Sequence, residues 1–182
     1  PIELVGNIGL WQQAAVNDLG VINAHFRKKE QVSKFGKKYA NSAYRWQDNI
    51  RTKGIERLFP DYFTGFMNLH APAAYLRSTF DEVWASVPEL LERTSSHRFR
   101  CADDVNQWGM LWWQIASGKF SPFMTDNVVS GVDDNTVDGL CDIITHASHD
   151  MICLNDPEGD IDFEALSAKV KNAYETIMQE KS

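Results

Sequence analysis

Apolar side chains recur at helical spacing along most of this chain of 182 residues. The pattern predicts a helix over residues 10–25 and further helix over 28–57. We expect the second stretch to be interrupted near Gly36 and Gly54 and to end before Pro60, because glycine and proline are poor helix formers.

Residues 74–92 form a second region of helical periodicity. Pro88 predicts a kink or the start of a separate helix there, because proline has no amide hydrogen to donate inside a helix. We expect five apolar residues of this region to share one face against the core. They are Leu76, Phe80, Val83, Trp84 and Val87.

The densest apolar pattern starts at Ala102. A helix that is apolar on most sides is a buried one. We expect Asp103 or Asp104 to cap it, because a carboxylate can accept hydrogen bonds from first-turn amides and favours the positive end of the helix dipole. Its apolar residues are Val105, Trp108, Leu111, Trp112, Trp113, Ile115 and Ala116.

Two short runs in the last third of the chain are typical of strands, TDNVVSGV at 125–132 and MICLN at 151–155. Helices are predicted over 136–146 and 162–179. The predicted fold class is therefore α/β, mainly helical with a few short strands. The length fits a single domain or part of one over 1–182.

Positive charge is concentrated in residues 27–57, which we call the basic segment. It carries ten of the eighteen Lys and Arg residues and three acidic ones, although the whole chain has a formal net charge of -7. Such a segment can attract phosphate or an anionic surface, and it is equally compatible with a solvated helix face. The sequence leaves both interpretations open.

Cysteine usage and hydropathy favour a soluble protein of a reducing compartment. The three cysteines have no CxxC spacing, which argues against a disulfide framework and against a zinc knuckle. The sequence holds neither a signal-peptide pattern at residues 1–10 nor an uncharged apolar run of membrane-spanning length.

Three familiar ligand-binding motifs are disfavoured. His146 and His149 could hold a metal from a helix end, but the HExxH partners of a zinc hydrolase are missing. The acidic run 155–164 departs from the calcium-loop order, so helix capping by Asp160 or Asp162 is the better interpretation. A GxGxxG motif and a GK[ST] phosphate loop are also missing from the sequence.

The stretch Arg98-Phe99-Arg100 is a candidate anion clamp. We expect Arg100 to lie just before the helix start, where its guanidinium could meet a phosphate beside the free amides of the first turn. An arginine beside an aspartate pair is also the common pattern of a structural ion pair.

A longer set of motifs resembles the third conserved region of the Stealth family of sugar-phosphate transferases. The residues that carry the resemblance are His70-Ala71-Pro72, then Arg77 to Val83, Arg93-Thr94, and RFRCADDVN at 98–106. Cys153-Leu154-Asn155-Asp156 and the helix after it resemble the family's fourth conserved region. The resemblance covers about residues 60–182.

This resemblance implies transfer of a sugar 1-phosphate from a nucleotide sugar, usually a UDP sugar, to a glycan hydroxyl in capsular or exopolysaccharide synthesis. It implies catalytic roles for His70, Arg100 and Asp104, with His97 and Arg98 as support. The residues expected to bind substrate are Arg98, Asn106, Asn155 and Asp156. Mg²⁺ is the expected cofactor, its ligands unassigned, and nucleic acid is not an expected partner. The expected location is the cytoplasm, with peripheral contact to the inner face of the membrane.

The family's first conserved region, with a VYTWVD-like strand, and its second, with an NDD motif, have no counterpart in this sequence. We therefore interpret the chain as the C-terminal half of a larger α/β catalytic domain that needs the missing N-terminal regions for activity. The alternative is a non-catalytic module that binds an anionic glycan or a membrane surface through the basic segment.

Overall fold

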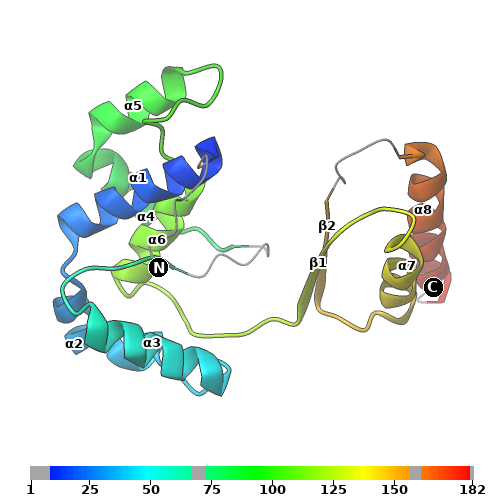
Figure 1. Ribbon diagram of the computed structural model, residues 1–182, viewed down its shortest axis with the longest axis horizontal. Helices are drawn as coiled ribbons and strands as arrows, with labels where there is room; N and C mark the ends of the chain where they lie inside the picture. Colours follow the sequence, from blue (N-terminus) through cyan, green and yellow to red (C-terminus); the bar gives the residue numbers. More distant parts are fainter. Residues whose placement is uncertain (1–8, 67–72, 156–160, 181–182) are drawn as a thin grey trace, which may run out of the picture. The chain divides into compact units, whose positions relative to one another are not determined.

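The computed structural model describes residues 9–66, 73–155 and 161–180 (Figure 1). These residues belong to two compact units, which divide between Phe123 and Met124. The helices of the first unit are α1 (Leu10–His25), α2 (Lys28–Tyr39), α3 (Trp46–Leu58), α4 (Arg77–Ser86), α5 (Pro88–Ser96) and α6 (Gln107–Ala116). The second unit contains β1 (Asn127–Gly131), α7 (Val137–His146), β2 (Met151–Asn155) and α8 (Phe163–Glu180).

The predicted fold class, mainly helical α/β with short strands, is confirmed by this order of elements. The strands predicted at 125–132 and 151–155 are present as 127–131 and 151–155, and the helices predicted over 136–146 and 162–179 are present as 137–146 and 163–180. The extent of the domains, 1–182 as one domain or part of one, stays a prediction.

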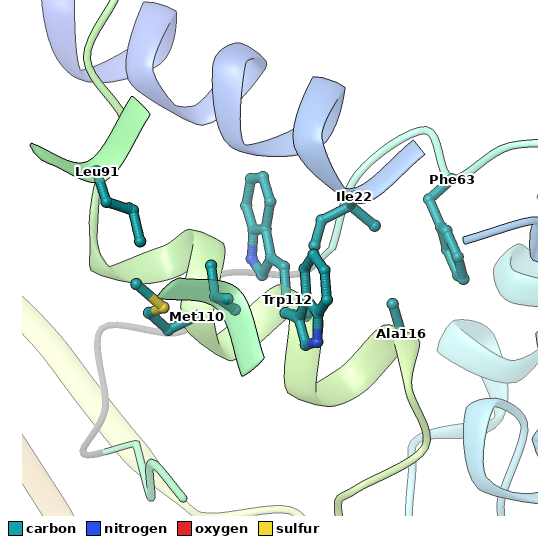
Figure 2. Close-up of a cluster of buried hydrophobic side chains, with 8 residues drawn as sticks. Ile22, Phe63, Leu91, Met110, Trp112 and Ala116 are labelled. Atoms are coloured by element: carbon teal, nitrogen blue, oxygen red, sulfur yellow. The ribbon is translucent and has the colours of Figure 1, made fainter. Parts of the chain in front are cut away.

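The predicted buried helix is the centre of the first unit. α6 packs against α1 and α4, and Met110, Trp112, Trp113 and Ala116 of α6 are buried. Figure 2 shows Ile22 from α1 and Leu91 from α5 gathered with Met110 and Trp112 around one interior. Burying each large apolar side chain stabilises the fold by about 1.5–3 kcal/mol. This core therefore supports the loop that precedes α6.

Gln114 is a buried polar residue of α6 that holds the start of α4. Its Oε1 atom accepts a hydrogen bond from the Leu76 backbone amide at 2.9 Å, and its Nε2 atom donates to the Ala74 carbonyl at 3.0 Å. The Leu76 amide precedes the first turn of α4, where backbone donors lack helical partners. One side chain thus satisfies two backbone groups of the segment that leads into α4.

The expected core face of residues 74–92 is only partly correct. Val83 is buried and Val87 packs against the core, whereas Leu76, Phe80 and Trp84 are exposed. α4 buries the narrow stripe of Thr79 and Val83, one turn apart, because it contacts α6 over only that width. Pro88 is the first residue of a separate helix, α5, as one of the two predicted outcomes requires.

The expected breaks at Gly36 and Gly54 are wrong, because both glycines lie inside helices. The chain turns instead at residues 40–45, where asparagine side chains bind the backbone. Asn49 accepts from the Asn41 amide at 2.9 Å and donates to the Asn41 carbonyl at 2.8 Å. Local side-chain hydrogen bonds of this kind compete with helix formation and decide where α2 ends.

The end of α2 caps the end of α6. Lys38 Nζ donates to the carbonyls of Gly118 at 2.6 Å and Phe120 at 2.9 Å. Tyr39 Oη lies 2.9 Å from the Ala116 carbonyl, and burial raises the pKa of the Tyr39 phenol. The last carbonyls of a helix lack intrahelical partners and carry partial negative charge, so the Tyr39 hydroxyl stabilises them, while Lys38 holds the carbonyls of the segment that follows α6. Lys38 is therefore a structural lysine of the basic segment.

The second unit is built on two parallel strands. β1 and β2 pair in register from Asn127 opposite Met151 to Gly131 opposite Asn155, and α7 connects them. Parallel strands need such a crossover helix. α8 packs against α7, and the Asp162 carboxylate accepts from the Ala165 amide at 3.0 Å, as the predicted cap requires.

Candidate functional site

The loop of residues 97–106, between α5 and α6, contains most of the predicted site residues of the first unit. We call it the arginine loop. Asp104 organises it from inside: its Oδ1 atom lies 2.7 Å from His97 Nδ1, and its Oδ2 atom accepts from the Cys101 amide at 2.7 Å. The hydrogen bond from the Cys101 amide and the contact with His97 lower the pKa of this buried carboxyl. An ionised carboxylate only accepts hydrogen bonds, so His97 Nδ1 carries the hydrogen.

Two neighbouring residues, Asn17 and Thr94, tie the arginine loop to the helices around it. Asn17 of α1 donates from Nδ2 to the carbonyls of Ala102 at 2.9 Å and Asp104 at 2.8 Å. The Val105 amide donates to Thr94 Oγ1 at 3.3 Å. The backbone of the loop is therefore held from α1 and α5 before α6 begins.

The expected cap of α6 is wrong. α6 starts at Gln107, and the Oδ1 atom of Asn106 accepts from the Trp108 amide at 2.7 Å. Asp103 pairs instead with Arg93 at 3.0 Å on the surface. Asn106 takes the capping position because it directly precedes Gln107, the first helical residue. Its backbone is extended, as is typical of an N-cap residue. The substrate contact of Asn106 stays a prediction. The side-chain oxygen of Asn106 already accepts the hydrogen bond from the Trp108 amide.

The later start of α6 also moves Arg100 away from the helix terminus. The expectation that Arg100 lies beside the first-turn amides is wrong, because residues 101–106 separate it from Gln107. Arg98, Phe99 and Arg100 are all exposed, and the Arg98 guanidinium lies 5.3 Å from the centre of the Phe99 ring. Among the residues that the structure describes, none forms a hydrogen bond or ion pair with the Arg100 side chain. Its charge is therefore available to an anion.

A second carboxyl, Asp18, lies beneath the start of α6, and sequence reasoning missed it. Asp18 is almost fully buried on α1, and its Oδ1 atom accepts from the Asn106 amide at 3.1 Å while Oδ2 has no hydrogen-bond partner among the described residues. Burial raises its pKa to about 7, against the effect of backbone hydrogen bonds from Asn106 and Gly109. A single aspartate on a helix with apolar neighbours offers no signal in the sequence that it is buried.

The remaining predicted residues lie elsewhere. His70 and Asp156 fall outside the described residues, so their predicted roles are not tested. Asn155 is exposed at the carboxyl end of β2 in the second unit, beside an open groove of about 430 Å³ between this edge and α8. Ligands of parallel sheets commonly bind at the carboxyl ends of the strands. Its position agrees with a binding role and leaves that role a prediction.

The described residues do not offer an oxygen-ligand set for Mg²⁺ at the arginine loop. Mg²⁺ prefers octahedral oxygen coordination, and of the three ligand atoms that cluster in this loop, those of His97 and Cys101 are nitrogen and sulfur. The expected Mg²⁺ stays a prediction without ligands in this loop. The His146 and His149 rings face Asp142 and Asp126 respectively. None of the helices that the structure describes is long and apolar enough to cross a membrane.

Comparison with known proteins decides the family of the central segment. Residues 69–112 match the Stealth protein conserved region 3. The matched segment includes His70, α4, α5, the whole arginine loop and the first half of α6. The resemblance to Stealth proteins is confirmed by this match, and the assignment of the fourth conserved region around Asn155 stays a prediction.

Relatives cover nearly the whole chain. It is 28% identical over 171 residues to a receptor polysaccharide phosphotransferase, WefC, of Streptococcus gordonii, and 29% identical over 170 residues to a capsular polysaccharide phosphotransferase, WcwK, of Streptococcus pneumoniae. In both cases 92% of this chain matches 49% of the relative. An exopolysaccharide phosphotransferase, cps2G, of Lactiplantibacillus plantarum is 24% identical over 167 residues, with 91% of this chain and 48% of the relative covered. The chain therefore spans about half the length of these relatives.

Proposed function

We propose that this chain is the C-terminal half of a transferase that moves a sugar 1-phosphate from a nucleotide sugar, a UDP sugar, to a glycan hydroxyl in capsular or exopolysaccharide synthesis. The observation that carries the proposal is the pair of exposed arginines, Arg98 and Arg100, on a loop inside the Stealth match. The names of the relatives as polysaccharide phosphotransferases support the reaction class. The coverage of about half of each relative agrees with N-terminal regions that complete the site.

The chemistry requires positive charge at the transferring group. The acceptor hydroxyl oxygen forms a bond to the phosphorus that carries the sugar, the pyrophosphate bond breaks, and the nucleoside monophosphate leaves. Arginine suits this step because its planar guanidinium can donate two hydrogen bonds to phosphate oxygens and stays protonated. Arg100, without a partner among the described residues, takes this role in the proposal. His70, by the family resemblance, accepts the hydroxyl proton.

Asp104 acts in this proposal through the loop rather than on the substrate. It is buried, and its two oxygens bind His97 and the Cys101 amide on either side of Arg98 and Arg100. This arrangement holds the backbone that presents the arginines, and pre-positioned charge is worth more to a reaction than charge that must first be ordered. Asp104 is therefore a positioning residue in this proposal, rather than the catalytic residue that the resemblance implies.

The test is the Arg100→Ala substitution in the full-length protein. We expect transfer of sugar phosphate to fall by about 10³-fold, because one charge-stabilising donor is removed from the transition state. Arg100→Lys should recover part of the rate, since lysine supplies charge without the planar fork.

Arg51→Ala is the matched control, because Arg51 is an exposed arginine of α3 outside the Stealth match. Its transfer rate should equal that of the unmodified protein. Retained turnover in Arg100→Ala, with the fold intact by circular dichroism, would contradict the proposed role of Arg100.

A second candidate function rests on one face of α3. Trp46, Ile50, Lys53 and Arg57 are exposed and follow one another at helical spacing of three or four residues. A helix face that mixes a tryptophan and an aliphatic residue with cations suits the interface of an anionic membrane. We propose that this face gives the chain peripheral contact with the inner surface of the cytoplasmic membrane.

Not all of the basic segment is available for this contact. Lys28 is buried and donates from Nζ to the Phe59 carbonyl at 2.9 Å, and Lys38 binds the end of α6. Desolvation lowers the pKa of Lys28, as expected for an internal lysine. The exposed α3 face, rather than the total charge of the segment, therefore carries the proposal.

Vesicle sedimentation tests the membrane contact. We expect binding to vesicles that contain phosphatidylglycerol, weak binding to phosphatidylcholine vesicles, and a decrease of binding as salt rises. Lys53→Glu with Arg57→Glu should abolish binding, and Arg100→Ala should leave it unchanged. Equal binding by the charge-reversed protein would refute the membrane role of α3.

A further inference from the structure

The arginine loop brings together three side chains that could bind a metal ion. The proposed transfer reaction does not use them in this way. His97, Cys101 and Asp104 each offer one ligand atom, and these atoms all lie within 4.8 Å of one another. His97 and Cys101 are partly exposed, Asp104 is buried, and the Cys101 thiol is free. Their spacing, H-x₃-C-x₂-D, differs from the zinc motifs that sequence reasoning considered.

We propose that His97 Nδ1, Cys101 Sγ and Asp104 Oδ1 bind a transition-metal ion of the Zn²⁺ class, with a fourth position open to water or a ligand. A thiolate, an imidazole and a carboxylate form a typical ligand set for such ions. The thiolate excludes Mg²⁺ and Ca²⁺, which prefer oxygen ligands. The metal therefore differs from the Mg²⁺ expected for the phosphate groups.

The hydrogen bonds of the loop prepare the ligands. When the ion binds, it takes the place of the Nδ1 hydrogen, which moves to Nε2 in the other imidazole tautomer, and the thiol proton leaves to solvent. The hydrogen bond from the Cys101 amide to Asp104 Oδ2 at 2.7 Å is retained and orients the carboxylate. His97 Nδ1 and Asp104 Oδ1, which lie 2.7 Å apart, separate to admit the ion, and side-chain rotation places the three ligand atoms about 2.0–2.3 Å from Zn²⁺.

The position of the three ligands indicates what the ion does. His97 and Cys101 enclose the segment 98–100, so a metal between them would fix both ends of the stretch that carries Arg98 and Arg100. The ion stabilises the loop in the folded chain, because the three ligands are brought together only there. This role does not depend on the transfer reaction.

Cobalt titration of the reduced 182-residue chain tests the site, because Co²⁺ reports thiolate coordination by a sulfur-to-metal charge-transfer band. We expect the band to saturate at one ion per chain and Zn²⁺ to displace the Co²⁺, whereas an excess of Mg²⁺ leaves the band intact. Cys101→Ser should abolish the band, and His97→Ala should weaken binding by at least about tenfold.

Cys141→Ser and Cys153→Ser are the matched controls, because these free cysteines lie in the second unit, outside the cluster. Both should keep the band. Cys101→Ser is the decisive variant because the Cys101 amide can still bind Asp104, and Zn²⁺ should raise the melting temperature of the unmodified chain more than that of this variant. A band that persists in Cys101→Ser, or no band in the unmodified chain, would overturn the proposal.

Discussion

Two aspartates close to the start of α6 show how strongly the surroundings decide what one residue type does. Asp104 accepts hydrogen bonds from His97 and the Cys101 amide, and its pKa is lowered. Asp18 has one oxygen without a partner, and burial raises its pKa to about 7. Desolvation by burial has the largest effect on the pKa of Asp18, whereas the hydrogen bond from the Cys101 amide has the largest effect on that of Asp104. Asp104 keeps its charge, and Asp18 is protonated on the acid side of pH 7.

The raised pKa of Asp18 predicts that the chain becomes less stable as the pH rises. The folded state holds a proton on Asp18 up to about pH 7, whereas the unfolded state releases it near the ordinary aspartate pKa of 3.8. The contribution of protonated Asp18 to the free energy of unfolding is therefore complete below about pH 4. It decreases as the pH rises toward 7 and is lost above pH 7. Between these two ends of the pH range the free energy of unfolding differs by on the order of 2–4 kcal/mol.

Denaturant unfolding of the unmodified chain and of Asp18→Asn between pH 5 and pH 8 measures this effect. Asparagine keeps an oxygen for the Asn106 amide and cannot ionise, so the variant should lose less stability across this range. Asp103→Asn is the control, because its ion pair with Arg93 is exposed and worth little. Parallel pH profiles of the unmodified chain and Asp18→Asn would show that Asp18 does not titrate in this range.

At the scale of elements, α2 closely approaches the segment that follows α6. Gly118 follows the C-cap residue of α6 with φ +74, a left-handed conformation that favours glycine. A Cβ atom at Gly118 would lie 2.5 Å from the Phe35 ring. The glycine thus serves the backbone turn and the approach of α2 at the same position.

Gly118→Ala should destabilise the chain by about 2–4 kcal/mol, because it combines left-handed backbone strain with overpacking against Phe35. Thermal unfolding followed by circular dichroism measures the change. Gly20→Ala is the matched control: Gly20 lies inside α1 with no atom within 4 Å of an added Cβ, so alanine there should be neutral or stabilising. Equal melting temperatures for the two variants would contradict this interpretation of Gly118.

At the scale of the whole molecule, the candidate site residues are divided between the two units. The first unit holds the arginine loop over a core of tryptophans, and the second unit holds Asn155 at the carboxyl edge of a parallel strand pair. Parallel pairs of two strands are commonly part of larger sheets. This agrees with the proposal that the active transferase requires further regions, because the chain spans about half the length of its relatives.

The sequence alone predicted the elements whose cause is local. Three local patterns made elements predictable because each acts within a few residues. Helical periodicity predicted α1 and α7, apolar runs predicted both strands, and the missing amide hydrogen of Pro88 predicted the start of α5. The Asp162 cap follows from the same local rule. The motifs around the arginine loop likewise predicted the Stealth match from residue order.

Tertiary structure decided the contacts that join residues far apart in the chain. Three features each need two segments that folding brings together: the burial of Asp18, the hydrogen bonds from Lys38 to the segment after α6, and the anchoring of the Asp104 carbonyl by Asn17. Whether a polar group is buried, and which donors meet it, depends on the packing of other elements and leaves no periodic pattern in the sequence. The sequence therefore determined which residues could form the candidate site, and the packing of α1, α2 and α6 determined which of them support it from inside.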